Sequence, residues 1–243
     1  MLLNKKRLFL YKLLLNQKSN LKYEILNNNG VYTFLNFYSI EIAKKIDIDY
    51  SKFNGIGLDG FLMTNLINTL FKKKFVRLSF DFTSLAKILF SKLNLNKSRI
   101  AVVGSKEEDI VFFKKYIRTH YPGINVIYSR NGYFSDTTHQ NKCINQIISL
   151  EPDFILLGMG TEYQDLFALN IFSKYSHCQI FTCGGFIHQT RINQGKYYPN
   201  FIDKFNLRWF YRLLNEKNII NKIFPSIIYC FIYLFILRFK KQS

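Results

Sequence analysis

The feature that most constrains the fold is a regular alternation of short apolar runs with helical segments between residues 99 and 185. The runs predicted as strands are Ile100–Val103, Asn125–Tyr128, Phe154–Leu157 and Gln179–Thr182. Because these strands are short, almost wholly apolar and separated by helices, they fit a parallel sheet covered on both faces. Right-handed crossovers would make this arrangement a Rossmann-like α/β layer.

The segments between these strands carry helical periodicity or turn residues. Apolar side chains recur at intervals of three and four at Ile110, Phe113 and Ile117, and a Tyr-Pro-Gly turn follows at 121–123. The predicted helices of this half are Glu107–His120, Asn141–Leu150 and Leu166–Phe172.

The first hundred residues repeat the pattern less regularly. Strands are predicted at Val31–Leu35 and Gly55–Leu58, and helices at Ile40–Ile46, Phe61–Phe71 and Ser84–Leu93. No Pro-, Gly- or Ser-rich linker separates the halves, so we predict one composite α/β core over residues 1–199.

The charge of the chain points to anionic partners. It carries 34 Lys and Arg against 16 Asp and Glu, for a formal charge of +18. A basic surface attracts nucleic acid, anionic lipid or phosphorylated ligands. Zinc-finger spacing, an aromatic RNA-binding motif and a basic recognition helix are all missing, which argues against nucleic acid. Anionic lipid and diphosphate ligands remain, although part of the Lys excess fits the composition that an AT-rich genome imposes.

The cysteine and histidine patterns exclude several classes of protein. The four Cys form no CxxC pair, which indicates reduced thiols in the cytosol rather than a disulfide scaffold. The four His have no Cys or carboxylate at ligand spacing, so we predict no metal site. No Gly-x-Ser-x-Gly motif supports a nucleophilic hydrolase.

The two ends of the chain differ from the core. The first twenty residues have basic and apolar elements of a signal peptide. Because Lys interrupts their apolar runs and no small-residue cleavage site follows, we interpret them as an amphipathic helix or strand. Residues 200–243 form a predicted appendage, with a basic, aromatic helix at Asn200–Glu216 and an apolar run at Ile223–Leu237.

The apolar run of the appendage favours a helix that lies on the membrane surface. It is shorter than the ~20 residues that a membrane span needs. It also contains Pro225, and Arg238, Lys240 and Lys241 close it. The alternatives are a helix packed on the core and a true span.

Polar residues and glycines follow the predicted strands, where open parallel sheets bind their ligands. The candidates are Asn36, Asp59, Gly104, Ser105, Thr161, Gln164, Gly184 and Gly185. Asp59 stands between an apolar strand and a helix, so its carboxylate could act as a general base. The alternative is that Asp59 only forms a turn and caps the helix.

Phosphate could be bound at a glycine-containing loop and by arginines. The backbone N–H groups of residues 158–161 could approach a phosphate or ribose, although the spacing matches neither a Walker loop nor a complete dinucleotide motif. Arg191, Arg208 and Arg212 are candidate diphosphate ligands because guanidinium groups match phosphate oxygens. Each could instead be an ordinary surface arginine.

Five segments, read in order, resemble one family of bacterial glycosyltransferases. They are Arg77–Leu85, Ile100–Gly104, Tyr121–Gly123 with Asn131–Phe134, Ile144–Asn145 with Glu151–Thr161, and Leu207–Leu214. The resemblance extends over residues 31–215, and the ordered set is similar to the WecG/TagA/CpsF family, glycosyltransferase family 26.

This resemblance implies a Rossmann-like inverting transferase of bacterial surface-polysaccharide synthesis. Such enzymes move N-acetylmannosamine or a related hexose from a UDP-sugar to an undecaprenyl-diphosphate-linked acceptor, without a metal or other cofactor. It further implies a peripheral position on the cytoplasmic face of an anionic membrane, and leaves homo-oligomers open.

The resemblance also assigns roles to residues. Asp59 would deprotonate the acceptor hydroxyl, and Asn36 would line the pocket. Thr161 and Gln164 would hold donor or acceptor, while Arg208 and Arg212 would balance diphosphate charge as UDP departs.

The chain departs from the family pattern at four places. Residues 161–165 read Thr-Glu-Tyr-Gln-Asp instead of Thr-Pro-Lys-Gln-Glu, and Phe34 stands where Thr is frequent. Tyr197–Pro199 stands near the position of an Arg-Ala-Pro segment, and Arg208 stands where Glu is usual. We interpret these departures as altered sugar specificity, with loss of activity as the alternative.

Two other functions compete with the transferase. The altered 161–165 loop would suit a non-catalytic glycolipid-binding or scaffold protein. A nicotinamide-dependent oxidoreductase would share the fold. The incomplete glycine motif and the missing acidic ribose ligand argue against it.

Overall fold

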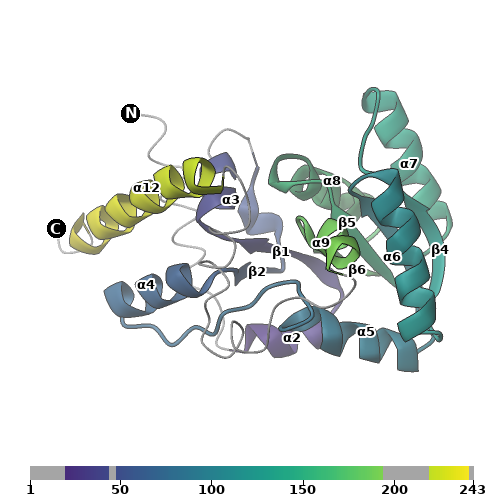
Figure 1. Ribbon diagram of the computed structural model, residues 1–243, viewed down its shortest axis with the longest axis horizontal. Coiled ribbons are helices and arrows are strands. Elements are labelled where there is room, and N and C mark those ends of the chain that lie inside the picture. Colours follow the sequence, from purple (N-terminus) through teal and green to yellow (C-terminus); the bar gives the residue numbers. More distant parts are fainter. Residues whose placement is uncertain (1–19, 44–47, 194–218, 241–243) are drawn as a thin grey trace.

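A computed structural model describes residues 20–43, 48–193 and 219–240 (Figure 1). Its centre is a parallel six-stranded sheet in the order β2-β1-β6-β5-β3-β4. The strands are β1 (Gly30–Leu35), β2 (Gly55–Leu58), β3 (Arg99–Gly104), β4 (Asn125–Arg130), β5 (Phe154–Gly158) and β6 (Gln179–Thr182). This topology confirms the predicted Rossmann-like α/β fold.

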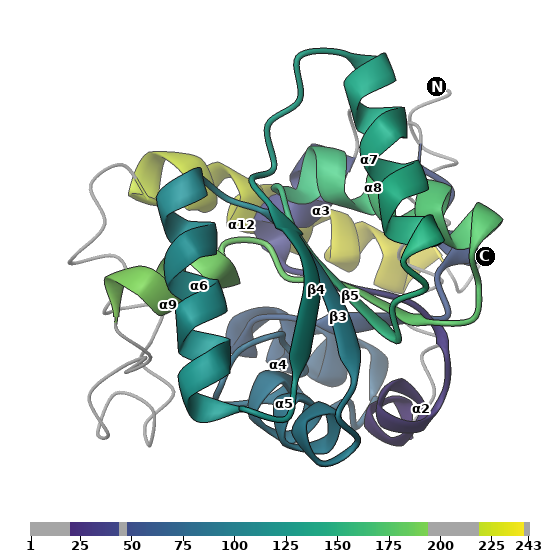
Figure 2. The ribbon, with the colours of Figure 1, turned by 90° about the vertical axis from the view of Figure 1, so that its right-hand side faces the viewer.

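Helices cover both faces of the sheet, as the apolar strands require. The helical elements are α2 (Leu21–Asn27), α3 (Phe37–Ala43), the 3-10 turn η1 (Tyr50–Lys52), α4 (Phe61–Phe71), α5 (Leu85–Leu95), α6 (Glu107–His120), α7 (Thr137–Ser149), α8 (Thr161–Lys174), α9 (Phe186–Ile192) and α12 (Ile219–Lys240). The first face buries side chains of α3, α4, α7, α8 and α12, and the second those of α2, α5, α6 and α9. Figure 2 shows α6 and α9 together on one side of the sheet, with α7 and α8 on the other.

Three predicted helix starts are wrong in the same direction. The helices predicted from Ile40, Asn141 and Leu166 begin at Phe37, Thr137 and Thr161. The first turns of α7 and α8 are largely polar, and that of α3 precedes the repeat of apolar residues from which its start was predicted. The hydrophobic pattern therefore did not reveal these turns. At α7 the start is set by Asp136, whose carboxylate accepts the His139 N–H at 2.7 Å.

The second face is packed with aromatic rings, which gives the many phenylalanines a structural role. Phe80 packs edge-on against Phe186, with ring centroids 5.2 Å apart, and lies 5.6 Å from Phe181. Phe34 joins this cluster, 6.1 Å from Phe80. A Cβ on Gly57 would lie 2.5 Å from the Phe34 ring, so the glycine leaves room for this large side chain. Phe34 is therefore accommodated by packing.

The C-terminal helix α12 lies against α3 and α4 (Figure 1). Ser226, Cys230 and Leu234 are buried in this contact, and the Ser226 hydroxyl bonds to the Glu41 carboxylate. One side of α12 therefore packs on the core, and the predicted position of the helix on a membrane surface stays a prediction. The predicted helix at 200–216 and the opening segment lie outside the described residues. No helix in the described part of the chain is long and apolar enough to cross a membrane.

Candidate active site

Parallel strands bring the predicted site residues to one edge of the sheet. The loops after β1, β2, β5 and β6 carry Asn36, Asp59, Thr161 and Gly184, and all lie at the carboxyl ends of the strands. The chain passes to the first face after β1 and β5 but to the second face after β3 and β6. Such changes of direction are where open α/β sheets bind ligands. With strands about 4.8 Å apart, Asp59 lies about 10 Å from the end of β6.

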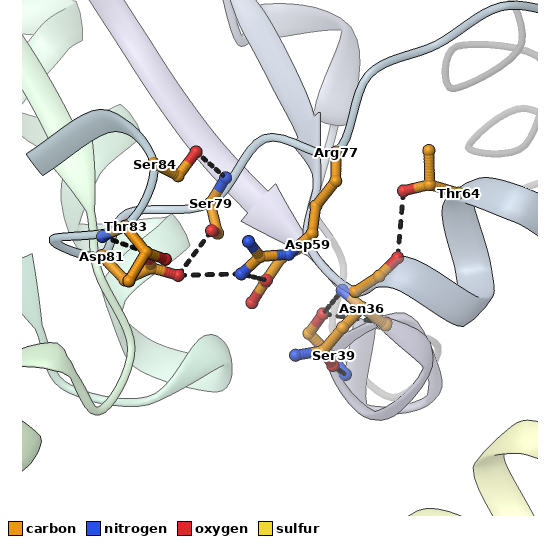
Figure 3. A network of polar contacts seen from close by, with 10 residues as sticks. Asn36, Ser39, Asp59, Thr64, Arg77, Ser79, Asp81, Thr83 and Ser84 are labelled. Atoms are coloured by element: carbon orange, nitrogen blue, oxygen red, sulfur yellow. Dashed lines mark hydrogen bonds and ion pairs between the residues drawn. The ribbon is translucent and has the colours of Figure 1, made fainter. Parts of the chain in front are cut away.

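Asp59 presents a partly exposed carboxylate at the end of β2 (Figure 3). Its backbone N–H donates to the Leu35 carbonyl at 2.9 Å, which ties it to β1. The Leu78 N–H donates to the Leu58 carbonyl at 2.9 Å and brings the following segment alongside β2. A terminal guanidinium N–H of Arg77 then reaches Asp59 Oδ1 at 3.5 Å. The Asp59 side chain remains 34% exposed, as a general base that meets a substrate must.

Arg77 bridges Asp59 to a second, more deeply buried carboxylate. It donates to Asp81 Oδ2 at 2.8 Å, and the Ser79 hydroxyl donates to the same carboxylate oxygen at 2.7 Å. The Thr83 N–H donates to the other oxygen at 2.8 Å. Burial alone would lower the pKa of Arg77, but the charges of Asp59 and Asp81 raise it above its ordinary value. A permanent cation therefore stands beside the Asp59 carboxylate.

Asn36 directly precedes α3 and lies next to the Asp59 turn. Its Oδ1 accepts the Ser39 N–H at 3.0 Å, while its own N–H donates to the Ser39 hydroxyl at 2.7 Å. This reciprocal pair caps the helix. A Cβ on Gly60 would lie 3.9 Å from the Asn36 Cβ, which places the two loops side by side. The structure thus gives Asn36 a capping role, and its predicted contact with substrate stays a prediction.

Gln164 and Gly184 are joined across the ends of β5 and β6. The Gln164 side chain is 3% exposed, and its Oε1 accepts the Gly184 N–H at 3.1 Å. Among the described residues its Nε2 has no partner. A Cβ on Gly160 or on Gly184 would meet nothing within 4 Å. Because buried polar groups are normally satisfied, this amide is well suited to bind a ligand. Thr161, the first residue of α8, lies in the same helical turn as Gln164.

The remaining predicted glycines have structural reasons of their own. Gly104 has a φ of +156°, and a Cβ there would lie 2.5 Å from the Gly158 carbonyl oxygen. The neighbouring Ser105 N–H donates to the same oxygen at 2.9 Å, so the ends of β3 and β5 are pressed together. Gly185 is the residue that precedes α9. Direct contacts of Gly104 and Gly185 with a ligand stay predictions.

A buried carboxyl group, which the sequence did not indicate, anchors the first turn of α8. Asp165 is fully buried and accepts hydrogen bonds from the Thr33 and Tyr50 hydroxyls, each at 2.9 Å. The Thr182 hydroxyl donates to Thr33 at 2.8 Å and extends the network to β6. Burial raises the pKa of Asp165 to about 6, although these hydrogen bonds oppose the shift.

Asp165 should make stability depend on pH. The folded protein retains a proton on Asp165 up to about pH 6, whereas the unfolded chain loses it near pH 4. Folding stability should therefore fall as pH rises from about 4 to 6, by about 3 kcal/mol from this group alone. Urea denaturation across this range should show that decrease in wild type but not in Asp165→Asn. The exposed control Glu151→Gln should keep it, and an equal slope in wild type and Asp165→Asn would refute the assignment.

Of the three candidate arginines, the structure describes Arg191. Arg191 lies on α9 and forms an ion pair with Asp109 of α6. Arg208 and Arg212 lie outside the described residues, so their diphosphate role stays a prediction. Within 20–43, 48–193 and 219–240, no group of three or more His, Cys, Asp or Glu side chains could hold a metal ion.

Comparison with known proteins places this chain in a family. The sequence model described as "Glycosyl transferase WecG/TagA/CpsF family" matches residues 25–243. The chain is 37% identical over 206 residues to the UDP-Gal:alpha-D-GlcNAc-diphosphoundecaprenol beta-1,4-galactosyltransferase of Shigella boydii, covering 84% of this chain and 86% of that protein. It is 30% identical to the N-acetylglucosaminyldiphosphoundecaprenol N-acetyl-beta-D-mannosaminyltransferase of Bacillus subtilis, over 53% of this chain and 48% of that protein.

Proposed function

Because the chain belongs to the WecG/TagA/CpsF family of glycosyl transferases, we propose that it moves a sugar from a UDP donor to an undecaprenyl-diphosphate-linked GlcNAc, with inversion. The observation that carries the proposal is the partly exposed Asp59 carboxylate at the sheet's carboxyl edge, held beside Arg77. The test is transfer from UDP-sugars to a short-chain GlcNAc-diphosphate-lipid.

Galactose is the first donor sugar to test. The relative whose alignment covers 84% of this chain is named for UDP-Gal. The alignments with the relatives named for N-acetylmannosamine cover 53% of this chain. N-acetylmannosamine is the second donor, and both suit an acceptor that ends in GlcNAc-diphosphoundecaprenol.

In the proposed reaction Asp59 acts on the acceptor. As the acceptor hydroxyl oxygen forms a bond to the anomeric carbon, its proton passes to the Asp59 carboxylate. The bond between the anomeric carbon and UDP breaks on the opposite side, and the electron pair leaves with UDP. Asp59 then releases the proton to solvent. Arg208 and Arg212 balance the charge on the departing diphosphate, so the proposal needs no metal ion.

The exposed side of α12 supports attachment to the membrane surface. Opposite its buried contact, the helix exposes the apolar side chains Ile228, Phe231, Ile232, Phe235 and Ile236. Their spacing places them along one stripe of the helix. Basic residues close the chain at Arg238, Lys240 and Lys241. An apolar stripe beside basic residues suits the surface of an anionic bilayer, and we assign the protein to the cytoplasmic face of the cell membrane.

Charges introduced into this stripe should release the protein from membranes. Phe231→Glu with Phe235→Glu should weaken binding to phosphatidylglycerol-containing liposomes by about tenfold or more. Point changes are preferable to truncation, since Cys230 and Leu234 belong to the buried core. The matched control is Leu95→Glu with Val111→Glu, which changes two exposed apolar residues elsewhere. Liposome sedimentation measures the effect, and equal binding by both double variants would contradict the assignment.

A further inference from the structure

A buried carboxylate on α6 holds two partly exposed side chains of α9. Asp109 lies in the first turn of α6 and is fully buried. His188 Nδ1 lies 3.0 Å from Asp109 Oδ2, and Arg191 Nε donates to Oδ1. The Ser105 hydroxyl also donates to Asp109. Figure 2 shows α9 running beside α6 on the second face, where these contacts form.

This arrangement fixes which atoms of His188 and Arg191 face outward. Burial would raise the pKa of Asp109, but hydrogen bonds from Ser105, Arg191 and His188 hold it well below its ordinary value. An ionised Asp109 accepts the His188 Nδ1–H, which leaves Nε2 on the outer side of the ring. The His188 and Arg191 side chains are 49% and 34% exposed. In the described part of the chain, Nε2 and the terminal guanidinium nitrogens have no partner.

We propose that His188 and Arg191, positioned by Asp109, bind a diphosphate, and that this is the diphosphate of the nucleotide donor. The inference rests on the proposed function and names a further part of the same site. If these residues served only to hold α6 and α9 together, the Arg191–Asp109 ion pair would be sufficient. The structure holds a second nitrogen donor beside it, and a guanidinium with an imidazolium suits two neighbouring phosphate groups.

The position in the sheet favours the donor as the source of the diphosphate. The pair lies on α9, which follows β6, and Asp109 lies on α6, which follows β3; the strand between these two, β5, leads to α8 on the opposite face. A ligand at such a change of direction also meets the unpaired Gln164 amide at Gly184. From β6 to Asp59 is about 10 Å, or two strand spacings, which leaves room for the transferred sugar and the acceptor hydroxyl.

Charged residues at the start of α6 act on the pair. Asp109 contacts both His188 and Arg191, and the charge of Glu108 acts on Arg191. Glu107 accepts a hydrogen bond from Asn131 at 2.9 Å. Arg191 supplies a permanent positive charge for a diphosphate at this place.

The test compares UDP with uridine, which lacks the diphosphate. Arg191→Gln should weaken UDP binding by about 10- to 100-fold and leave uridine binding unchanged. His188→Asn keeps a donor for Asp109 but lacks Nε2, so it should also weaken UDP binding and leave uridine binding unchanged. Arg118→Gln, at the far end of α6, removes the same charge and should change neither affinity. Calorimetry measures UDP, ligand-observed NMR measures uridine, and thermal melting checks folding.

The outcomes separate this inference from the proposed function. If both variants keep the wild-type preference for UDP over uridine, or wild type has none, the inference is wrong even where transfer occurs. If the preference disappears in Arg191→Gln but no sugar is transferred to any GlcNAc-diphosphate-lipid, the inference stands and the proposed function fails. A parallel titration with the GlcNAc-diphosphate-lipid identifies the source. If the variants bind the GlcNAc-diphosphate-lipid more weakly but bind UDP as wild type does, the pair still binds a diphosphate, but its assignment to the donor is wrong.

Discussion

Asp59→Asn is expected to lower kcat for sugar transfer by about 10²- to 10⁴-fold, the contribution that a positioned general base makes. Asn has nearly the same shape but cannot take the proton of the acceptor hydroxyl. The Asp59 side chain is partly exposed and its contact with Arg77 is long, at 3.5 Å, so the fold should tolerate the change. The affinity for UDP and the melting temperature should stay close to wild type.

The control for Asp59→Asn is the same substitution at the opposite edge of the sheet. Asp49 is exposed and caps η1 ahead of β2, where its Oδ1 accepts the Ser51 N–H at 3.0 Å. Asn caps helices as well as Asp does, so Asp49→Asn should transfer sugar at the wild-type rate. Steady-state kinetics with a short-chain acceptor separate kcat from KM. A normal kcat in Asp59→Asn would remove Asp59 from the role of base.

Arg77→Gln is expected to reduce both stability and turnover. Removing the cation breaks the ion pair between Arg77 and Asp81, whose side chain is only 10% exposed. Breaking a buried pair from one side costs about 3 kcal/mol. Because Arg77 also fixes the environment of Asp59, kcat should fall by about tenfold or more. Urea denaturation and steady-state kinetics measure the two effects.

Two further variants separate the charge of Arg77 from its geometry. Arg77→Lys keeps the charge but cannot reach two carboxylates with a planar fork, so its stability should be intermediate. Asp81→Asn added to Arg77→Gln removes the buried negative charge that lost its ion pair with Arg77, and it should restore part of the lost stability without restoring kcat. Full wild-type stability and turnover in Arg77→Gln would show that the bridge is unimportant.

Much of the fold could be predicted because each strand of the sheet can be recognised from its own residues. A strand buried on both faces must be apolar along its whole length, so the runs at β2, β5 and β6 were recognisable without knowledge of their neighbours. Once the strands are parallel, the residues that follow them meet at one edge. Asp59 and Gln164 could therefore be placed at the same edge of the sheet before their contacts were known.

The partners of these residues could not be predicted in the same way. His188 and Asp109 are 79 residues apart, and only the packing of α9 on α6 brings them together. Local spacing had suggested that no carboxylate accompanies His188. The link from Arg77 to Asp59 likewise depends on the backbone bond between Leu78 and Leu58, which carries no sequence signature.

The structure also shows where the departures from the family pattern fall. In the segment 161–165, the unchanged Gln164 is buried and bonds to Gly184 after β6. The changed position Asp165 is also buried and bonds to β1 and η1, so this change is part of the framework. Tyr163 stands where the family usually has Lys, and it is exposed. We therefore place any altered specificity on the outer side of this turn.

The most direct test of the account is the anomeric configuration of the product. Wild-type protein is incubated with UDP-galactose, then with UDP-N-acetylmannosamine, and a short-chain GlcNAc-diphosphate-lipid in the presence of EDTA, and the new linkage is read by NMR. The account predicts a β-linked sugar from the α-linked donor, because Asp59 activates the acceptor for a single displacement. An α-linked product, or no transfer from either donor by folded protein that binds UDP, would contradict it.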